Sequence, residues 1–412
     1  MTSTREPTQA RIDDTGNILV APPALREHDT VRDFFGSTVT PEQLASGTID
    51  LTHRTVYLCG DVSGVDRGQL ASAARVFVVR DLPHGGGEEV EGPWPVVGPG
   101  RVPLRVHGAG VYYRRFFGLG ADHFGRIGAE HAFQSLTEST KPGTAHRSGI
   151  YLTPVTRDGD ELRFRLLRCS TNFSGPTEGF RPTDTDIVDA LNDEAATVFR
   201  DQAPLNHVLA QIYHNTLGTP ERKQSKARIS AHADKTKDMP ANGIMAFCTF
   251  YDGLDKLQPL AADPFDHGVK GVSGLTRLHF RLKDQTGERG EAAPVLPAQF
   301  SVTLYPGSVF FMPLSTNRLY THEIRPSGLD AASLPTRLGY VVRCSKTEAV
   351  HKDGHTFLEL AGERVKLEPP TEAGMDELRG LYAEENRTSS VIDYGDRFLF
   401  SMNTGDYRAP RV

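Results

Sequence analysis

The sequence is poor in cysteine, and its few cysteines argue against two kinds of small scaffold. The 412 residues contain only four, Cys59, Cys169, Cys248 and Cys344, which lie far apart along the chain. This spacing suggests neither a disulfide framework nor a CxxC zinc site. Most of the four lie in apolar, strand-like runs, so we expect buried thiols.

Long hydrophobic runs and an excess of positive charge are also missing. No segment approaches about 18 consecutive apolar residues, the length of a membrane-spanning helix, and residues 1–10 lack the apolar core of a secretory signal. We therefore expect a cytoplasmic protein without a membrane partner, whose oligomeric state stays open. A formal net charge of -6 argues against phosphate binding over a broad surface, although a local basic groove is still compatible with it.

What the chain does contain is turn-forming residues. It has 40 glycines and 27 prolines, which favours a mainly β fold with flanking helices, in the α+β class. The length allows two or three domains. We predict an N-terminal α/β extension or lid region over residues 1–125, a core over 126–350, and a C-terminal hairpin and helix over 351–412.

Local patterns predict the individual elements. Helices are expected to begin after Thr40, which is followed by a proline and a capping-box glutamine, over about 129–136, after residues 183–186, and over 372–385. A strand over 149–155 is expected to form a hairpin with 161–169 around Asp158-Gly159. Seven further strands in about 120 residues are typical of a sandwich or jelly roll. They are expected over 228–233, 244–251, 276–282, 300–305, 308–314, 320–324 and 337–344.

A histidine and an aspartate within this strand set point to a metal site. His232 and Asp234 are two residues apart, and residues i and i+2 of an extended strand share a face. His322, 88 residues after Asp234, lies in a strand-like segment and can supply a third ligand. Two histidines and one carboxylate leave three positions of an octahedral iron(II) open, as O2 chemistry with a chelating co-substrate requires.

A second segment, His351-Lys-Asp353-Gly-His355, has the same His-x-Asp spacing. Its Asp-Gly dipeptide is typical of a hairpin turn, and strand-like segments flank it on both sides. We therefore interpret these residues as a solvated turn and not as metal ligands.

Two arginines distinguish the first pattern from a chance occurrence. Arg337 and Arg343 lie six residues apart on an apolar strand, so both guanidinium groups are expected to face the same side. Buried cations cost several kcal/mol unless an anion meets them. Because arginine binds carboxylates through a bidentate fork, a dicarboxylate co-substrate is the natural counter-ion.

Taken together, these residues resemble the iron(II)- and 2-oxoglutarate-dependent oxygenases, specifically their AlkB-like branch. The resemblance covers residues from about 209 to 345, and a weaker resemblance extends back to about residue 128. It implies a double-stranded β-helix (jelly-roll) core, here with an N-terminal extension. Three flanking segments also match the family pattern: Ala210-Gln-Ile-Tyr213, Ser308-Val-Phe-Phe-Met-Pro313 and Arg318-Leu-Tyr-Thr-His322.

The resemblance also implies a role for each matching residue. The catalytic iron(II) would be bound by His232, Asp234 and His322. The co-substrate 2-oxoglutarate would be held by Arg337 at its distal carboxylate, with Arg343 near the metal-bound carboxylate, Tyr213 as a hydrogen-bond partner, and Gln211 in place of the family's asparagine. The reaction would consume O2 and release succinate and CO2 while a substrate is hydroxylated, oxidatively demethylated or desaturated.

Some positions depart from the family pattern. Gly339 stands where a polar side chain usually contacts the co-substrate, so that contact is lost or supplied elsewhere. Thr236 stands where DNA-repair members carry an acidic residue that contacts the base. In the halogenating variant of the family a halide takes the metal position of the carboxylate, so the presence of Asp234 argues against that variant. Insertions are expected at 253–274 and 284–298.

Three hypotheses about the substrate follow. The leading one is a small molecule, favoured by the acidic net charge, by Thr236 and by an N-terminal region large enough to form a lid; the aromatic segments 111–117 and 172–180 would then be candidates for a pocket wall. The alternative is a methylated base in DNA or RNA, favoured by the family branch and by the basic run 221–228 with Lys235 and Lys237. A non-catalytic metal-binding jelly-roll module is the third, but it leaves the two arginines unexplained.

Overall fold

The computed structural model describes residues 8–59, 65–80, 82, 93–137, 144–168, 173–221, 223–283, 296–395 and 397–412. Strands dominate these residues and few helices accompany them, as the composition predicts. None of the helices in them is long and apolar enough to cross a membrane. The α-helices of the described residues are α1 (Asp29–Arg32), α2 (Pro41–Ala45), α3 (Arg67–Leu70), α4 (His123–Glu130), α5 (Pro182–Val198), α6 (Leu314–Leu319) and α7 (Glu372–Arg387).

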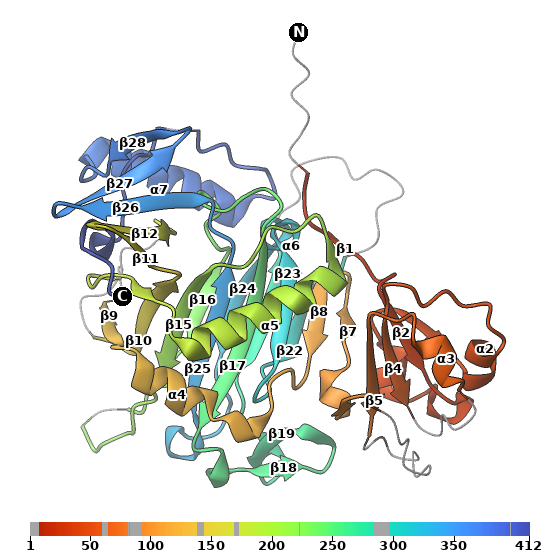
Figure 1. Ribbon diagram of the computed structural model, residues 1–412. Helices are drawn as coiled ribbons and strands as arrows, with labels where there is room; N and C mark the ends of the chain where they lie inside the picture. The colour runs from red at the N-terminus through yellow and green to blue at the C-terminus, as the bar shows by residue number, and fades with distance from the viewer. Residues whose placement is uncertain are drawn as a thin grey trace.

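A nine-stranded sheet lies at the centre of the molecule (Figure 1). The strand order is β13-β10-β15-β25-β17-β23-β8-β7, and β9 pairs with β10. All neighbours are antiparallel except β10 and β13. The strands are β7 (Leu104–Val106), β8 (Gly110–Tyr113), β9 (Gln134–Thr137), β10 (Thr144–Thr153), β13 (Glu178–Gly179), β15 (His207–Tyr213), β17 (Ile244–Asp252), β23 (Val309–Pro313) and β25 (Thr336–Arg343).

A four-stranded sheet packs against one face of the nine-stranded sheet. Its order is β16-β24-β21-β22, formed by Ile229–His232, Tyr320–Arg325, Arg277–Leu282 and Gln299–Thr303 respectively. The two sheets share one apolar core, in which Phe280 of β21 lies 5.5 Å from Phe310 of β23, measured between ring centroids. Burial of these aromatic rings is a main contribution to holding the sheets together.

The long helix α5 covers the opposite face of the nine-stranded sheet (Figure 1). It begins with Pro182 at its first turn, where a missing N–H is harmless, and Asp184 accepts the backbone N–H of Arg181. The predicted apolar stripe is confirmed, because the residues three and four positions apart are all buried against the sheet: Ile187, Val188, Leu191, Ala195 and Val198.

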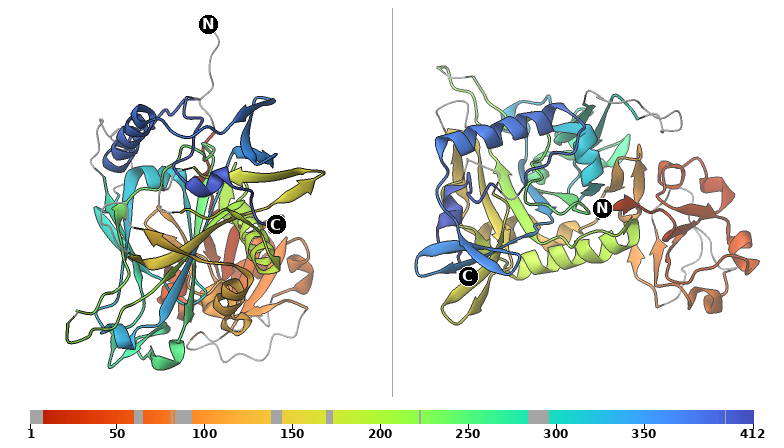
Figure 2. Two further views of the ribbon diagram at one scale, coloured as in Figure 1. Left: turned by 90° about the vertical axis from the view of Figure 1, so that its left-hand side faces the viewer. Right: turned by 90° about the horizontal axis from the view of Figure 1, so that it is seen from above.

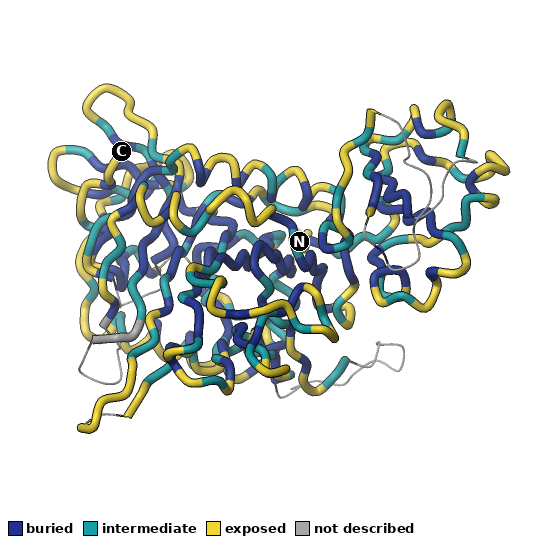
Figure 3. Tube along the Cα trace, turned by 90° about the horizontal axis from the view of Figure 1, so that it is seen from below, coloured by how far each residue is buried: buried dark blue, intermediate teal, exposed yellow. Residues whose placement is uncertain are grey.

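A separate parallel sheet forms from the N-terminal residues, in the order β3-β2-β4-β5-β6. Apolar side chains cover both of its faces, and Figure 3 shows the buried strands inside this part of the molecule. Arg75 and Arg101 each donate to the buried carboxylate of Glu194 in α5 at 3.0 Å, which fastens this sheet to the core. Its strands are β2 (Asn17–Val20), β3 (Ser37–Val39), β4 (Thr55–Cys59), β5 (Arg75–Val79) and β6 (Val96–Val97).

Three smaller sheets complete the fold. Figure 2 shows that α7 lies on a different side of the molecule from the N-terminal sheet. The first has the order β11-β12-β26-β27-β28, formed by Thr156–Asp158, Glu161–Leu166, Thr347–Lys352, His355–Leu360 and Glu363–Lys366. The second consists of β18 (Gln258–Leu260), β19 (Asp263–Val269) and β20 (Val272–Ser273), within the predicted insertion 253–274. The third pairs β1 (Arg11–Ile12) with β14 (Phe199–Arg200).

Most predicted elements are confirmed. The seven strands predicted after residue 228 correspond to β16, β17, β21, β22, β23, β24 and β25. The capping box of α2 is present, since Thr40 accepts the N–H of Gln43 and the Gln43 side chain accepts the N–H of Thr40. Cys59, Cys248 and Cys344 are free and buried, whereas Cys169 and much of the predicted insertion 284–298 lie outside the described residues.

Two predictions were wrong. The helix expected over 129–136 is α4, which begins after the N-cap Asp122 and ends at Glu130; His131 is extended because its ring is fixed by Glu178 and Asp184. The strand 149–155 does not form a hairpin with 161–169. Instead β12 pairs with the short β11 around Gly159, at φ +61°, and then with β26, because β10 continues in the nine-stranded sheet.

Candidate metal and co-substrate site

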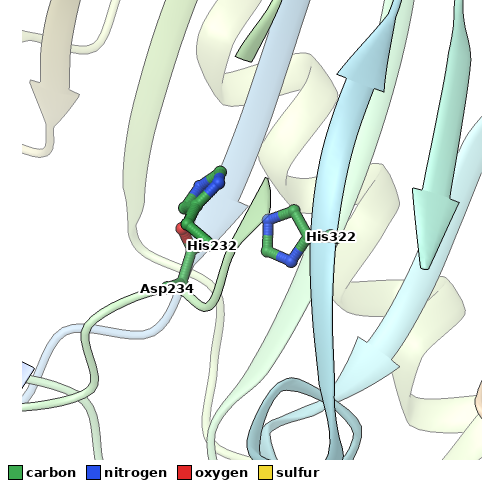
Figure 4. A group of neighbouring side chains, drawn as sticks. All are labelled: His232, Asp234 and His322. Carbon is green, nitrogen blue, oxygen red and sulfur yellow. The ribbon is translucent and has the colours of Figure 1, made fainter. Parts of the chain in front are cut away.

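The strands β16 and β24 bring the three predicted metal ligands together (Figure 4). His232 ends β16, and His322 is its direct antiparallel partner in β24, with ring centroids 4.5 Å apart. Asp234 follows on the loop after β16. One ligand atom from each of the three residues lies within 4.8 Å of the others. The arrangement therefore offers two imidazoles and a carboxylate to one ion.

The protonation of the two imidazoles suits metal binding. Nδ1 of His232 lies 2.9 Å from the carbonyl of Ser230 and therefore donates to it, which leaves Nε2, 3.6 Å from Asp234 Oδ1, as the nitrogen available to a metal. Burial lowers the pKa of His322 to about 3. His322 is consequently a neutral imidazole at pH 7, the form that coordinates metal ions.

The carboxylate of Asp234 is held in its charged form. Burial alone would raise its pKa, but the guanidinium of Arg343 outweighs this effect and holds the pKa well below its usual range. Nε and Nη2 of Arg343 donate to Asp234 Oδ2 at 2.9 and 2.8 Å. The structure thus places Arg343 directly on the carboxylate of a candidate metal ligand, with the other oxygen of Asp234 toward His232.

Side-chain amides from distant elements fix the loop that carries Asp234. Asn317 of α6 accepts the backbone N–H of Asp234 and donates to its carbonyl, both at 2.8 Å. Asn386, in the last turn of α7, accepts the N–H of Ala233 at 2.6 Å. The neighbouring Glu385 accepts both the N–H and the hydroxyl of Thr236. No motif in the sequence pointed to these contacts, because they depend on the packing of α6 and α7.

Arg337 is buried without a charged partner. It is 4% exposed, and its guanidinium carbon lies 3.9 Å from the ring centroid of Tyr213. Its Nε is buried and has no hydrogen-bond partner, and none of the salt bridges among the described residues includes Arg337. A buried cation without a charged partner is costly unless an anion meets it.

The remaining predicted co-substrate residues lie beside Arg337. Tyr213 is its antiparallel partner in β15, and the Tyr213 hydroxyl donates to Oε1 of Gln211 at 3.3 Å. Gln211 pairs across the strands with Gly339. One cavity of about 310 Å³ is lined by all seven predicted site residues: His232, Asp234, His322, Arg337, Arg343, Tyr213 and Gln211.

Several other lining residues were not predicted as site residues. An aromatic pair, Tyr151 of β10 and Phe173, with ring centroids 4.6 Å apart, forms part of the wall with Thr249 and Lys235. Phe173 belongs to the aromatic segment 172–180 that was a candidate for the pocket wall. The other such segment, 111–117, instead packs in apolar cores, with β8 in the nine-stranded sheet.

The basic run beside the site is partly used within the protein. Nζ of Lys226 donates to the carbonyls of Ser327 and Leu329, and the buried Lys237 pairs with Asp238 at 3.3 Å. Lys223 is exposed, and Lys235 lies over the ring of Tyr382. The run therefore presents fewer free cations than its sequence indicates.

The donor set at the cavity fits iron(II), since imidazole and carboxylate ligands suit this ion and the cavity leaves room for further ligands. The turn segment 351–355 does not contribute. Asp353 and Gly354 have φ values of +49° and +75°, which a two-residue hairpin turn requires, and the segment joins β26 to β27. Within the described residues it forms no metal-binding group.

A second group of possible ligands, Glu130, His131 and Asp184, forms an ion network instead. The two ring nitrogens of His131 lie 3.0 Å from Glu178 and 2.7 Å from Asp184, so neither is available to a metal. Burial lowers the pKa of His131, but hydrogen bonds to Asp184 and Glu178 outweigh it and raise the pKa to about 9. The charged imidazole joins α4, β13 and α5.

This raised pKa predicts a pH dependence of stability. A histidine with a folded-state pKa of about 9 and an unfolded value near 6.5 stabilises the fold fully below pH 6.5, and the contribution disappears as pH rises through 9. In urea titrations at pH 6 and pH 9.5, the unfolding free energy of the wild type should fall by about 3 kcal/mol more than that of His131→Gln. An equal fall in both proteins would contradict a charged His131.

Comparisons with known proteins do not assign this chain to a family. No family model and no curated protein matches the chain. Among solved structures, OsALKBH1 is 13% identical with a TM-score of 0.31, covering 59% of this chain and 99% of its own. The non-heme α-ketoglutarate-dependent epimerase SnoN from nogalamycin biosynthesis is 13% identical with a TM-score of 0.27, covering 58% and 80%. An oxidoreductase of the 2OG-Fe(II) oxygenase family from Burkholderia pseudomallei is 10% identical with a TM-score of 0.22, covering 47% and 72%. TM-scores this low do not establish a shared fold.

Proposed function

We propose that this chain is an iron(II)- and 2-oxoglutarate-dependent oxygenase of the AlkB-like branch, with the nine- and four-stranded sheets as its double-stranded β-helix core. The observation that carries the proposal is that one cavity contains both the donor set of His232, Asp234 and His322 and the buried, unpaired cation Arg337. The first binds a divalent metal and the second binds a carboxylate, so together they suit a dicarboxylate that also chelates the metal.

Each residue then has a defined task. Iron(II), when bound with 2-oxoglutarate and O2, supplies the oxidising chemistry that releases succinate and CO2. Arg343 keeps the Asp234 carboxylate ionised and oriented, and Arg337 anchors the distal carboxylate of the co-substrate. The apolar side chains of Met239 and Phe247 line the same cavity and exclude water from it.

A small molecule is the substrate class that we propose. The cavity of about 310 Å³ has to accommodate the co-substrate as well as the reacting part of the substrate. Thr236, at the position where a base contact would be expected, is bonded to Glu385, and Lys226 and Lys237 are used within the protein. A methylated nucleic-acid base is the alternative, supported by Lys235 at the cavity wall.

A succinate-release assay tests the proposal. The purified chain, with iron(II), 2-oxoglutarate and O2, is incubated with metabolite pools, free nucleosides or methylated oligonucleotides, and His232→Ala serves as the control. We expect turnover above the control with a small-molecule pool. Turnover confined to oligonucleotides, with salt-dependent binding, would establish the alternative. Succinate release equal to that of His232→Ala in every arm, even without substrate, would contradict an oxygenase.

A further inference from the structure

Gly339 has a specific consequence for the shape of the co-substrate end of the cavity. A Cβ atom on Gly339 would lie 2.9 Å from Nη1 and 3.2 Å from Nη2 of Arg337, and 3.2 Å from Cε2 of Tyr213. These distances mean that the guanidinium of Arg337 bends back over its own strand into the space that a side chain at 339 would fill. The glycine therefore allows the position of Arg337, but it offers the bound anion no hydrogen bond.

A hydroxyl on the neighbouring strand lies beside this gap. Thr249 of β17 is the antiparallel partner of Gly339 in β25, and directly opposite residues of two strands share a face. Thr249 is among the residues that line the same cavity as Arg337. Thr249 is 0% exposed, and its Oγ1 has no hydrogen-bond partner among the residues that the structure describes.

The other hydroxyl near Arg337 on this strand is already engaged. Tyr251, the partner of Arg337 in β17, donates to the carbonyl of Leu304 at 2.9 Å and accepts the N–H of Thr276 at 3.1 Å. Thr249 is thus the hydroxyl of β17 that remains available. A buried hydroxyl without a hydrogen-bond partner and a buried cation without an anion both destabilise the folded protein. One bound carboxylate can accept hydrogen bonds from both groups.

We infer that Thr249 is a co-substrate-binding residue whose hydroxyl donates to the carboxylate held by Arg337, in place of the side chain that Gly339 lacks. The inference rests on the proposed function and adds to it a binding residue on β17, two strands away from the Tyr213 side of the pocket. Gly339 and Thr249 then act as a pair, the first making room for the guanidinium and the second completing the hydrogen bonding of the anion.

Binding measurements test this role without turnover. Calorimetric titration of 2-oxoglutarate into the full chain loaded with iron(II), without O2, gives the dissociation constant. Thr249→Val keeps the shape and removes the hydroxyl, so we expect the dissociation constant to rise about ten-fold or more, as for a hydrogen bond to a charged group. Thr249→Ser should stay within about three-fold of the wild type. The melting temperature of the metal-free Thr249→Val protein should be unchanged or higher, because a buried hydroxyl without a partner is removed.

Ser308 offers a matched control. It is also 0% exposed, and its carbonyl accepts the N–H of Thr249, but its side chain does not line the cavity. Ser308→Ala should bind 2-oxoglutarate like the wild type.

If the wild type binds 2-oxoglutarate and the folded Thr249→Val protein binds it equally well, the role inferred for Thr249 is wrong and the proposed function stands. If the metal-loaded wild type does not bind 2-oxoglutarate, the proposed function fails. Should Thr249→Val not fold, Thr249→Ala replaces it with the same expected loss of affinity.

Discussion

Replacing Arg337 with methionine is expected to weaken 2-oxoglutarate binding strongly and to make the metal-free protein more stable. The buried guanidinium stacks on Tyr213 and has no carboxylate partner in the described part of the chain. Methionine keeps an unbranched apolar chain and removes the uncompensated charge, so the free energy of unfolding should rise by about 1 to 4 kcal/mol. Loss of the charged partner should weaken 2-oxoglutarate binding by about 2 kcal/mol or more, which is roughly thirty-fold.

Arg343 is a matched control for this prediction, because it lies on the same strand and lines the same cavity. It differs in having a partner, Asp234, at 2.8 Å. Arg343→Met leaves that buried carboxylate without its guanidinium partner, so it should lower the free energy of unfolding by about 3 to 5 kcal/mol. Urea titration without 2-oxoglutarate and calorimetry with it measure both quantities. If both arginine variants lost stability to the same degree, Arg337 would be a structural residue and not an anion site.

His322→Ala and Asp234→Ala should both lose the metal, but only the second should strongly destabilise the metal-free protein. Removing either ligand should weaken iron(II) binding more than about a hundred-fold and reduce succinate release to background. Asp234→Ala also removes the carboxylate that pairs with the buried Arg343, which costs about 3 to 5 kcal/mol of unfolding free energy. His322 is a neutral imidazole, so its removal costs only lost packing.

The measurements are iron(II) titration and urea unfolding of the metal-free variants. His355→Ala is the control, because His355 belongs to the second His-x-Asp segment, is exposed, and lies at the hairpin between β26 and β27. It should keep metal binding, turnover and stability. Retained iron(II) affinity in His322→Ala, or a loss in His355→Ala, would contradict the assignment of the donor set.

Strand periodicity accounts for only part of the donor set. His232 and His322 both lie on strands, as their sequence patterns predict, and they face each other across β16 and β24. Asp234 was expected on the same strand as His232, two residues on and on the same face, but β16 ends at His232 and Asp234 lies on the loop that follows. The same periodicity placed Arg337 and Arg343 on one cavity. It did not reveal that Arg343 would pair with Asp234, because that contact depends on where the loop after β16 lies relative to β25.

Other features depend on contacts between distant segments and left no local signal. The end of α4 is set by His131, whose ring is fixed by residues of β13 and α5. Asn317 and Asn386 act through their side-chain amides, and Thr249 contributes one buried hydroxyl, so the contacts of all three depend on which distant segments pack beside them. Hydrophobic patterns predict which face of a strand is buried, but they do not predict which buried hydroxyl lacks a partner.

The hydrogen bond between Asn386 of α7 and the loop that carries Asp234 also affects the order in which the site forms during synthesis. Asn386 follows Ala233 by 153 residues, so it leaves the ribosome long after His232, Asp234 and His322 have all emerged. Until then the amides of Ala233 and Thr236 lack the acceptors that fix the loop. A nascent chain therefore carries all three candidate metal ligands before the loop is fixed, and we expect tight iron(II) binding only once α7 is complete.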